Sequence, residues 1–229
     1  MQIEAIKVRR LYLQVAQQLR ERISAGEFPP GQRLPSERDL AAGLGVSRPT
    51  VREAIIALEI AGLVEVRSGS GVYVVSRSGS LRELGDSSSP GPFEILEARM
   101  LIEAETCALA ATRIDDGQLE YLQRLVDDMA EENRQEAVSE EADERFHCVI
   151  AEAAGNSALS ASIAWLWRLR NASPISVHFQ RRVRREGIRP IIADHQAIVD
   201  ALAARDPERS RAAMRNHLQR VIEQLLEAV

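Results

Sequence analysis

The sequence predicts a mainly α-helical protein of two domains, the first with three helices and a β-hairpin and the second helical throughout. Three observations predict this. A chain of 229 residues suits two modest domains of about 100 to 200 residues each. Ser, Gly and Pro dominate residues 76–92, as they do in flexible linkers. Short β-branched runs bounded by turn residues occur only before that stretch. We therefore expect domains at 1–76 and 93–229, joined by a linker at 77–92.

Three helices are predicted in the first domain. Apolar residues recur at helical spacing over 11–23, until the turn residues at 26–31. Ser36 is placed to cap a second, short helix, which two glycines would end. Ser47 is placed to cap a third helix, with Pro49 in its first turn and Gly62 at its end.

A hairpin follows the third helix. The β-branched runs Leu63–Val66 and Val72–Val75 flank the glycine-rich turn Ser68–Gly71. Helix, helix, turn, helix and hairpin is the order of a winged helix-turn-helix. The sequence therefore predicts that architecture for residues 1–76.

The second domain is predicted to be an all-helical bundle of six or seven helices, because apolar stripes at helical spacing must pack on one another. Asp115, Asn156 and Asp206 are expected to be caps or turn residues. The six stretches with helical periodicity are Phe93–Ala111, Gln118–Ala130, Asp143–Ala154, Ala158–Leu169, Pro190–Ala204 and Pro207–Leu226.

Charge and cysteine content bound the function. Residues 1–77 carry a net charge of +3 and residues 78–229 one of −8, so that only the first part suits a polyanion. Cys107 and Cys148 lie in apolar helical sequence, which favours two reduced thiols over a disulfide and indicates a cytoplasmic protein. The longest uncharged stretch, Ala153–Trp167, is too short and too polar to span a membrane.

The third helix has the residue types of a DNA-reading helix. Arg48, Thr50 and Arg52 lie on its first turn and a half, opposite the apolar stripe, where they would be exposed to base edges and phosphates. An arginine can bond two guanine acceptors at once. Arg38, in the preceding helix, could join them. The alternative for any single arginine-rich face is that it is only solvated.

These residues stand in a longer pattern. The segment Tyr12–Tyr73, above all LPSERDLAAGLGVSRPTVREAIIALEIAGLVEVRSGSGVYV at Leu34–Val74, resembles the DNA-binding domain of the GntR family of bacterial transcription regulators. The resemblance implies a dimer that binds a palindromic, double-stranded operator. The candidate DNA-binding residues, the last at the tip of the wing, are Arg38, Ser47, Arg48, Thr50, Arg52 and Gly69.

Three of the four histidines point to a metal site. Asp143 and His147 are four residues apart, so that they share one helix face, while His195 and His217 lie on two later helices. If the three helices surround one centre, a carboxylate oxygen and three imidazoles converge, a set that suits zinc or nickel. The alternative is that these histidines are hydrogen-bonded or surface residues.

Resemblance favours the metal. The segments DERFH at Asp143–His147, DHQAIVDAL at Asp194–Leu202 and MRNHL at Met214–Leu218 are similar to the signatures of the ligand-binding domain in the FadR-like branch of that family. This implies a divalent metal at the floor of an effector pocket, with zinc first and nickel or manganese as alternatives. The implied ligands are Asp143, His147, His195 and His217.

An acid is the expected effector. Arg99 matches a position at which the family supplies an arginine to a small carboxylate, although an ion pair with Glu103 one turn later is an alternative. The segments Phe93–Arg99 and Trp167–Pro174 are similar to those of hexuronate-responsive repressors, which favours a sugar acid such as glucuronate or galacturonate and makes Arg170 a pocket candidate. Another small organic acid is the alternative. Both tryptophans, Trp165 and Trp167, are otherwise core or interface residues.

The sequence therefore predicts a homodimeric transcription regulator whose operator binding responds to an acid. Repression relieved by the ligand is the commoner arrangement in such a family, and activation is the alternative. No nucleophile motif, phosphate-binding glycine loop or cofactor fingerprint occurs, so an enzyme is not expected. The rival hypotheses are a metal-dependent hydrolase fused to a DNA-binding module and a structural DNA-binding protein without a ligand.

Overall fold

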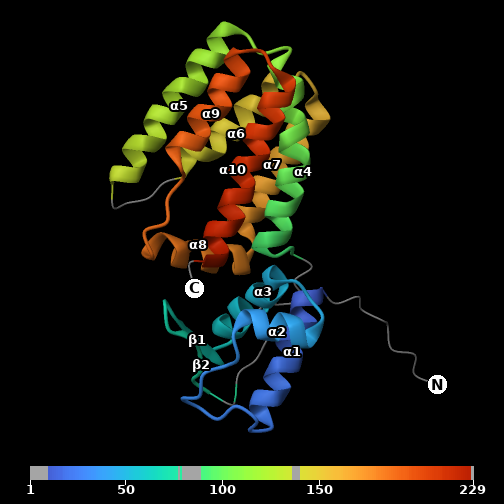
Figure 1. Cartoon of the computed structure of the whole chain (residues 1–229), viewed down its shortest axis with the longest axis vertical. Helices are drawn as coiled ribbons and strands as arrows, with labels where there is room; N and C mark the ends of the chain where they lie inside the picture. Colours follow the sequence, from blue (N-terminus) through green and yellow to red (C-terminus); the bar gives the residue numbers. More distant parts are fainter. Residues whose placement is uncertain (1–9, 77, 79–88, 136–139, 228–229) are drawn as a thin grey trace, which may run out of the picture. The chain divides into compact units, whose positions relative to one another are not determined.

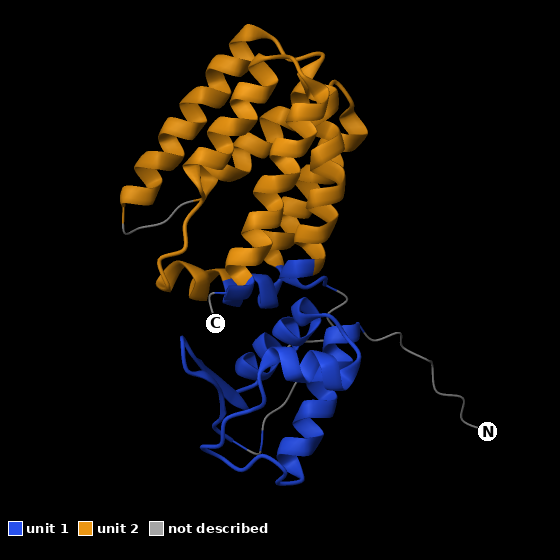
Figure 2. Cartoon of the chain, in the orientation of Figure 1, with its two compact units in different colours: residues 1–93, 173–179, 226–229 blue, residues 94–172, 180–225 orange. Residues whose placement is uncertain are grey.

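The computed structural model describes residues 10–76, 78, 89–135 and 140–227, so that most of the expected linker lies outside the described residues. The chain divides into two compact units, one of residues 1–93, 173–179 and 226–229 and the other of residues 94–172 and 180–225 (Figure 2). The prediction of a mainly α-helical protein is confirmed, with strands described only in one small hairpin.

The second and third helices form the helix-turn-helix, and the first helix precedes this motif and packs against the third. The three helices are α1 (Leu11–Ser24), α2 (Glu37–Leu44) and α3 (Arg48–Ile60), and α3 packs against both others. Both expected serine caps are present, because Ser36 Oγ accepts the Asp39 N–H (3.2 Å) and Ser47 Oγ accepts the Thr50 N–H (3.3 Å). Gly45 ends α2 with a φ of 66°, a conformation that glycine adopts without strain.

The wing is an antiparallel hairpin of β1 (Val64–Arg67) and β2 (Gly71–Val74). Its register pairs Val64 with Val74 and Val66 with Val72. Each strand is displaced by one residue from the predicted run, while the turn between them includes Gly69 with a φ of 68°. The winged helix-turn-helix predicted from the element order is therefore confirmed.

Seven helices follow among the described residues (Figure 1). Helix α5 packs against α6 and α9, and α6 packs against α7. Helix α8 falls in a stretch for which no helical segment was predicted; four of its twelve residues are arginines, and only Ile175, Ser176 and Phe179 are buried. The helices are α4 (Pro92–Ala111), α5 (Asp116–Arg134), α6 (Glu141–Ala153), α7 (Ser157–Ala172), α8 (Pro174–Arg185), α9 (Ile192–Ala203) and α10 (Pro207–Glu227).

Local signals set the ends of several of these helices. Asp115 forms a capping box with Gln118 before α5, and Asn156 Oδ1 accepts the Ala158 N–H (3.1 Å) before α7. Both cysteines are free thiols, as predicted, with Cys107 buried and Cys148 half-buried. None of the helices in the described part of the chain is long and apolar enough to cross a membrane.

Candidate functional site

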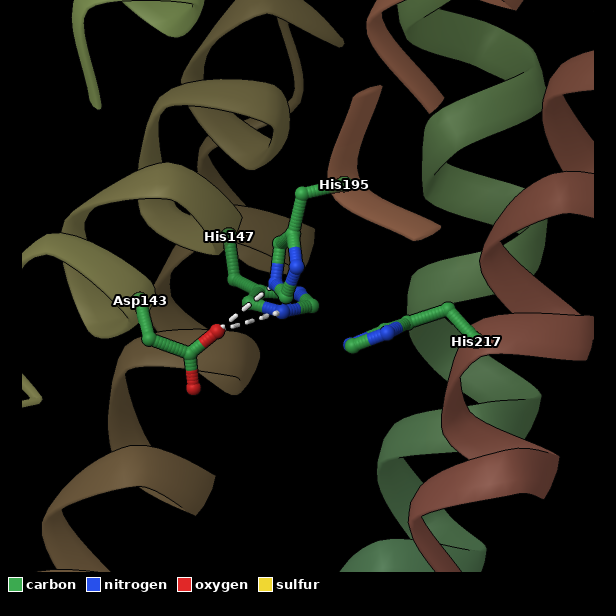
Figure 3. A group of neighbouring side chains, drawn as sticks. All are labelled: Asp143, His147, His195 and His217. Atoms are coloured by element: carbon green, nitrogen blue, oxygen red, sulfur yellow. Dashed lines mark hydrogen bonds and ion pairs between the residues drawn. The ribbon is translucent and has the colours of Figure 1, made fainter. Parts of the chain in front are cut away.

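The second unit brings together the four residues that the sequence singled out as metal ligands. Asp143 and His147 come from consecutive turns of α6, His195 from the first turn of α9 and His217 from the middle of α10. One ligand atom from each lies within 4.8 Å of the ligand atoms of the other three (Figure 3). The three imidazoles are buried, and Asp143 is partly buried at the edge of the group.

Asp143 is the point toward which two of the rings turn. Its Oδ1 lies 2.9 Å from Nε2 of His195 and 3.6 Å from Nε2 of His147. The ring of His217 closes the group, with its centroid 4.4 Å from that of His195 and 5.4 Å from that of His147. Three nitrogen donors and one carboxylate oxygen therefore share one small space.

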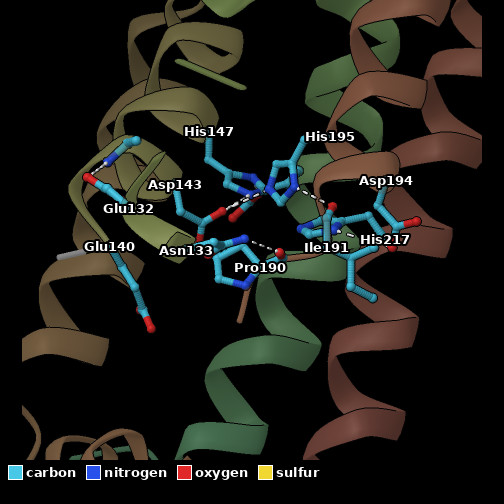
Figure 4. A network of polar contacts seen from close by, with 12 residues as sticks. Glu132, Asn133, Glu140, Asp143, His147, Pro190, Ile191, Asp194, His195 and His217 are labelled. Carbon is cyan, nitrogen blue, oxygen red and sulfur yellow. Dashed lines mark hydrogen bonds and ion pairs between the residues drawn. The ribbon is translucent and has the colours of Figure 1, made fainter. Parts of the chain in front are cut away.

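The outer nitrogen of His195 is held by the backbone that precedes α9. Its Nδ1–H donates to the carbonyl oxygen of Ile191 (2.9 Å), which holds the ring so that Nε2 faces the space shared by the four ligand atoms. The side-chain amide of Asn133 on α5 donates to the neighbouring carbonyl of Pro190 (2.9 Å) and so ties this segment to α5 (Figure 4).

The outer nitrogen of His147 faces a buried carboxylate. Nδ1 of His147 contacts Oε2 of Glu103, whose Oε1 accepts a hydrogen bond from Nε of Arg99 (2.6 Å). Burial alone would raise the pKa of Glu103, but Arg99 and then His147 lower it to about 2. Burial opposes the charged imidazole, yet Glu103 raises the pKa of His147. Glu103 is therefore an ionised partner that orients His147.

His217 has a comparable but looser partner. Its Nδ1 lies 3.9 Å from Oδ2 of Asp194, and Oδ1 of Asp194 is 2.8 Å from Nη2 of Arg220. Burial, with His195 beside it, lowers the pKa of His217 to about 4. The ring is therefore neutral at neutral pH, as a metal ligand must be.

The donor set fits a divalent metal. Nε2 of His147 is buried and has no hydrogen-bond partner among the described residues, although it points toward the shared space. A buried polar atom left without a partner costs about 1–3 kcal/mol, which a bound ion would relieve. Three imidazoles and one carboxylate suit zinc and neighbouring transition metals.

The two arginines predicted to bind an effector both lie over the ring of Trp167. Cζ of Arg99 lies 4.0 Å from the centroid of the Trp167 ring and Cζ of Arg170 lies 4.8 Å from it. Arg99 also forms the ion pair with Glu103 that was the alternative to effector binding, and Arg170 pairs with Glu140. Both guanidinium groups therefore lie within reach of one buried ring, and each has a carboxylate partner.

Sequence reasoning missed the two carboxylates behind the histidines. Glu103 was recognised only as a possible partner of Arg99, and Asp194 only as the residue before His195. Asp194 could have been found from the sequence, because it directly precedes the predicted ligand His195. Glu103 could not, because it lies on α4, far in the sequence from His147 on α6.

Most of the candidate DNA-binding residues lie on accessible parts of the first unit. Arg38 on α2, Arg48 at the start of α3 and Gly69 in the wing turn are exposed. Ser47 is exposed too, and its hydroxyl lies 2.8 Å from that of the half-buried Thr50, since Ser47 caps α3.

Arg52 corrects one expectation. It was predicted to project from α3 beside Arg48, but its side chain is only 1% exposed. Its Nε lies 2.5 Å from Oε1 of Glu37 in the first turn of α2. The helical period places Arg52 one turn from Arg48, but α2 packs against α3 and brings a carboxylate to this arginine, so that the exposure predicted for it is wrong.

Comparison with known proteins identifies both parts of the chain. Residues 11–74 match the family described as bacterial regulatory proteins, gntR family, and residues 94–220 match the FCD domain. The chain belongs to the gntR family. This GntR-family protein is 38% identical over 235 residues to the Uxu operon transcriptional regulator of Escherichia coli (strain K12), a match that covers 97% of this chain and 90% of that one.

Two further proteins are similar to this chain. The Exu regulon transcriptional regulator of the same strain is 37% identical over 223 residues, which are 95% of this chain and 85% of that one. The solved structure of Streptococcus agalactiae GntR is 30% identical, with a TM-score of 0.47 over 93% of this chain and 99% of that one. The family resemblance stated from the sequence is confirmed, and the protein is a DNA-binding transcription regulator and not an enzyme.

The two matched segments separate the candidate sites. All six candidate DNA-binding residues fall within the gntR match, and the four residues of the histidine cluster fall within the FCD match. The chain therefore combines a DNA-binding module with a domain whose core carries a candidate metal centre.

Proposed function

We propose that this GntR-family regulator is a homodimeric repressor that releases its operator when a small carboxylate, first of all a hexuronate, binds at a divalent metal in the FCD domain. The observation that carries the proposal is the convergence of Asp143, His147, His195 and His217, with ligand atoms within 4.8 Å of one another. Its DNA-binding domain is residues 1–76, its linker 77–92 and its sensing domain 93–229.

A metal would be held by the four residues that come from α6, α9 and α10. His195 is oriented by Ile191 O, His147 by Glu103 and His217 by Asp194, in the manner in which outer partners fix the imidazoles of metal sites. Zinc is the first candidate, with nickel or manganese as alternatives. When bound, the ion would supply a positive Lewis-acid centre that attracts a carboxylate.

An anionic effector is supported by the charges near the centre. Arg99 is buried and reaches Glu103 beside His147, and Arg170 shares the Trp167 ring with it. Arginine forks are the usual partners of carboxylates. The resemblance to hexuronate-responsive repressors supports glucuronate or galacturonate, as does the similarity to the regulators named for the Uxu operon and the Exu regulon.

Control of DNA binding follows from differential affinity. If the acid binds more tightly to the state that is incompetent for DNA, it withdraws the dimer from the operator. A coupling of about 1–3 kcal/mol would change operator affinity by roughly 5- to 150-fold. Arg38 and Arg48 provide exposed cations for DNA, Ser47 and Thr50 provide hydroxyls and Gly69 the wing tip. Arg52 would act at the DNA only after separating from Glu37.

The zinc content of the protein and its variants tests the assigned metal ligands. We expect purified protein to contain or take up one equivalent of zinc, and His217→Ala to lose it. His178→Ala is the matched control, because that histidine lies outside the cluster and its zinc content should not change. Unchanged zinc in a His147→Ala, His217→Ala double variant would refute these ligands.

Effector binding is tested on the metal-loaded protein. D-galacturonate or D-glucuronate should raise the melting temperature, because a ligand that binds only the native state stabilises it. The same acid should lower affinity for an operator duplex in fluorescence anisotropy. If neither these two acids nor any other small carboxylate shifts the melting temperature with zinc present, the sensing proposal fails and only the DNA-binding regulator stands.

A further inference from the structure

Trp167 carries an open hydrogen-bond donor in the interior of the second unit. Its side chain on α7 is 0% exposed, and its indole Nε1 has no hydrogen-bond partner among the described residues. Part of the ring packs against the apolar cluster of Ala151, Ile163 and Ile102. Buried tryptophan N–H groups nearly always find an acceptor, so that an unpaired one calls for an explanation.

The rest of the surroundings of Trp167 are polar and lead to the candidate metal centre. Its ring centroid lies 5.6 Å from the imidazole centroid of His147. Cζ of Arg99 and Cζ of Arg170 lie 4.0 and 4.8 Å from the indole. The indole therefore lies among apolar residues, one histidine of the candidate metal centre and two arginines.

The groups around and on the indole are hydrogen-bond donors without acceptor capacity. An indole N–H and two guanidinium groups can only donate hydrogen bonds, and none of them can accept one. Glu103 and Glu140 take up part of the donor capacity of the two arginines, but the indole N–H has no acceptor among the described residues. A group that completes this arrangement must bring an acceptor atom for the indole N–H, and an acid with several oxygens meets that condition.

We propose that Trp167 is an effector-contacting residue whose Nε1–H donates a hydrogen bond to an oxygen of the sugar acid. The inference rests on the proposed function, since it assigns a contact to the same ligand. A hexuronate carries ring and hydroxyl oxygens in addition to its carboxylate, so that one end can reach the metal while another oxygen accepts the indole N–H. Trp167 thereby favours an oxygen-rich acid over a short carboxylate with the same charge.

The chain provides its own control for this contact. Only two tryptophans occur, and Trp165 lies two residues earlier on α7 with 52% of its surface exposed. Trp165→Phe leaves Trp167 as the single indole, and Trp167→Phe keeps an aromatic ring but removes the N–H. Both variants are made in the full-length, zinc-loaded protein.

The first measurement leaves Trp167 intact. In ¹⁵N-labelled Trp165→Phe protein, the one indole N–H resonance should move downfield in a saturable way during titration with D-galacturonate or D-glucuronate, because the proton gains an acceptor. Calorimetry on the same sample gives the dissociation constant, which should equal that of the wild-type protein. Binding heat with an unmoved indole resonance would overturn the contact while the proposed function stands.

The second measurement removes the donor. Trp167→Phe should weaken hexuronate binding by roughly 2- to 10-fold, as expected when one hydrogen bond to a neutral oxygen is lost, with zinc content unchanged. Wild-type affinity in Trp167→Phe would overturn the contact, as would equal losses of affinity in the two variants. If the wild-type protein binds neither acid, calorimetry shows it before any variant is compared, and the proposed function and this inference fail together.

Discussion

Replacing Glu103 by glutamine should destabilise the protein far more than the same replacement at an exposed glutamate. The carboxylate is buried on α4, 2.6 Å from Nε of Arg99 and in contact with Nδ1 of His147. Glutamine keeps the shape but removes the charge. The buried guanidinium of Arg99 is then left without its anionic partner.

Burial sets the magnitude of this effect. Removing one member of a buried ion pair costs about 3–5 kcal/mol, because the remaining charge stays desolvated. We expect Glu103→Gln to lose about 3 kcal/mol of unfolding free energy, the lower end, since an amide can still form one hydrogen bond. Zinc affinity should also fall by roughly 10- to 100-fold, as is usual when the partner of a metal-bound histidine is lost.

The same helix supplies a matched control. Glu105 lies two residues later and is 2.9 Å from Nε of Arg211, but its side chain is 64% exposed. Exposed ion pairs contribute about 0–1 kcal/mol, so Glu105→Gln should be nearly neutral. Urea denaturation of metal-free protein, followed by circular dichroism, measures both variants without the contribution of zinc binding.

The pH dependence gives a further check with a definite sign. Because the pKa of Glu103 is lowered from 4.5 to about 2, its contribution to stability is complete above pH 4.5 and is lost as the pH falls toward 2. The difference between wild type and Glu103→Gln should therefore shrink over that interval. Equal losses in Glu103→Gln and Glu105→Gln, or a difference that does not change with pH, would refute the assignment of Glu103 as a buried, ionised anchor.

Three other predictions address DNA, metal and helix ends. Arg48→Ala should weaken binding to a duplex that the wild-type protein selects from a random pool, measured by fluorescence anisotropy, while hexuronate binding by calorimetry is unchanged; loss of both would indicate misfolding. Zinc affinity should decrease as the pH falls towards about 6, because imidazole binds zinc only when neutral, and an affinity that stays constant in a competition titration would contradict histidine ligation. Asp115→Ala should cost about 1 kcal/mol in urea denaturation by removing the cap of α5, whereas an unchanged midpoint would show that the capping box contributes nothing.

Sequence alone determined the elements and most residues of the candidate centre. Helical periodicity and caps such as Ser36, Ser47 and Asp115 act over a few residues, so that they can be recognised without knowledge of the rest of the chain. The spacing of Asp143 and His147 placed two ligands on one helix face for the same reason. Helix α8 was missed because its arginines obscure a sparse apolar pattern.

Tertiary packing decided which residues of other helices contact each of these helix faces. Arg52 is paired because α2 brings Glu37 to it, and His147 is oriented because α4 brings Glu103 to it. The unpaired indole of Trp167 beside two arginines is likewise a product of packing, since Arg99 lies on a different helix. Short-range patterns determine which residues share a face, but the contacts between faces depend on how helices distant in the sequence pack, and these contacts fix burial, charge and open hydrogen-bond donors.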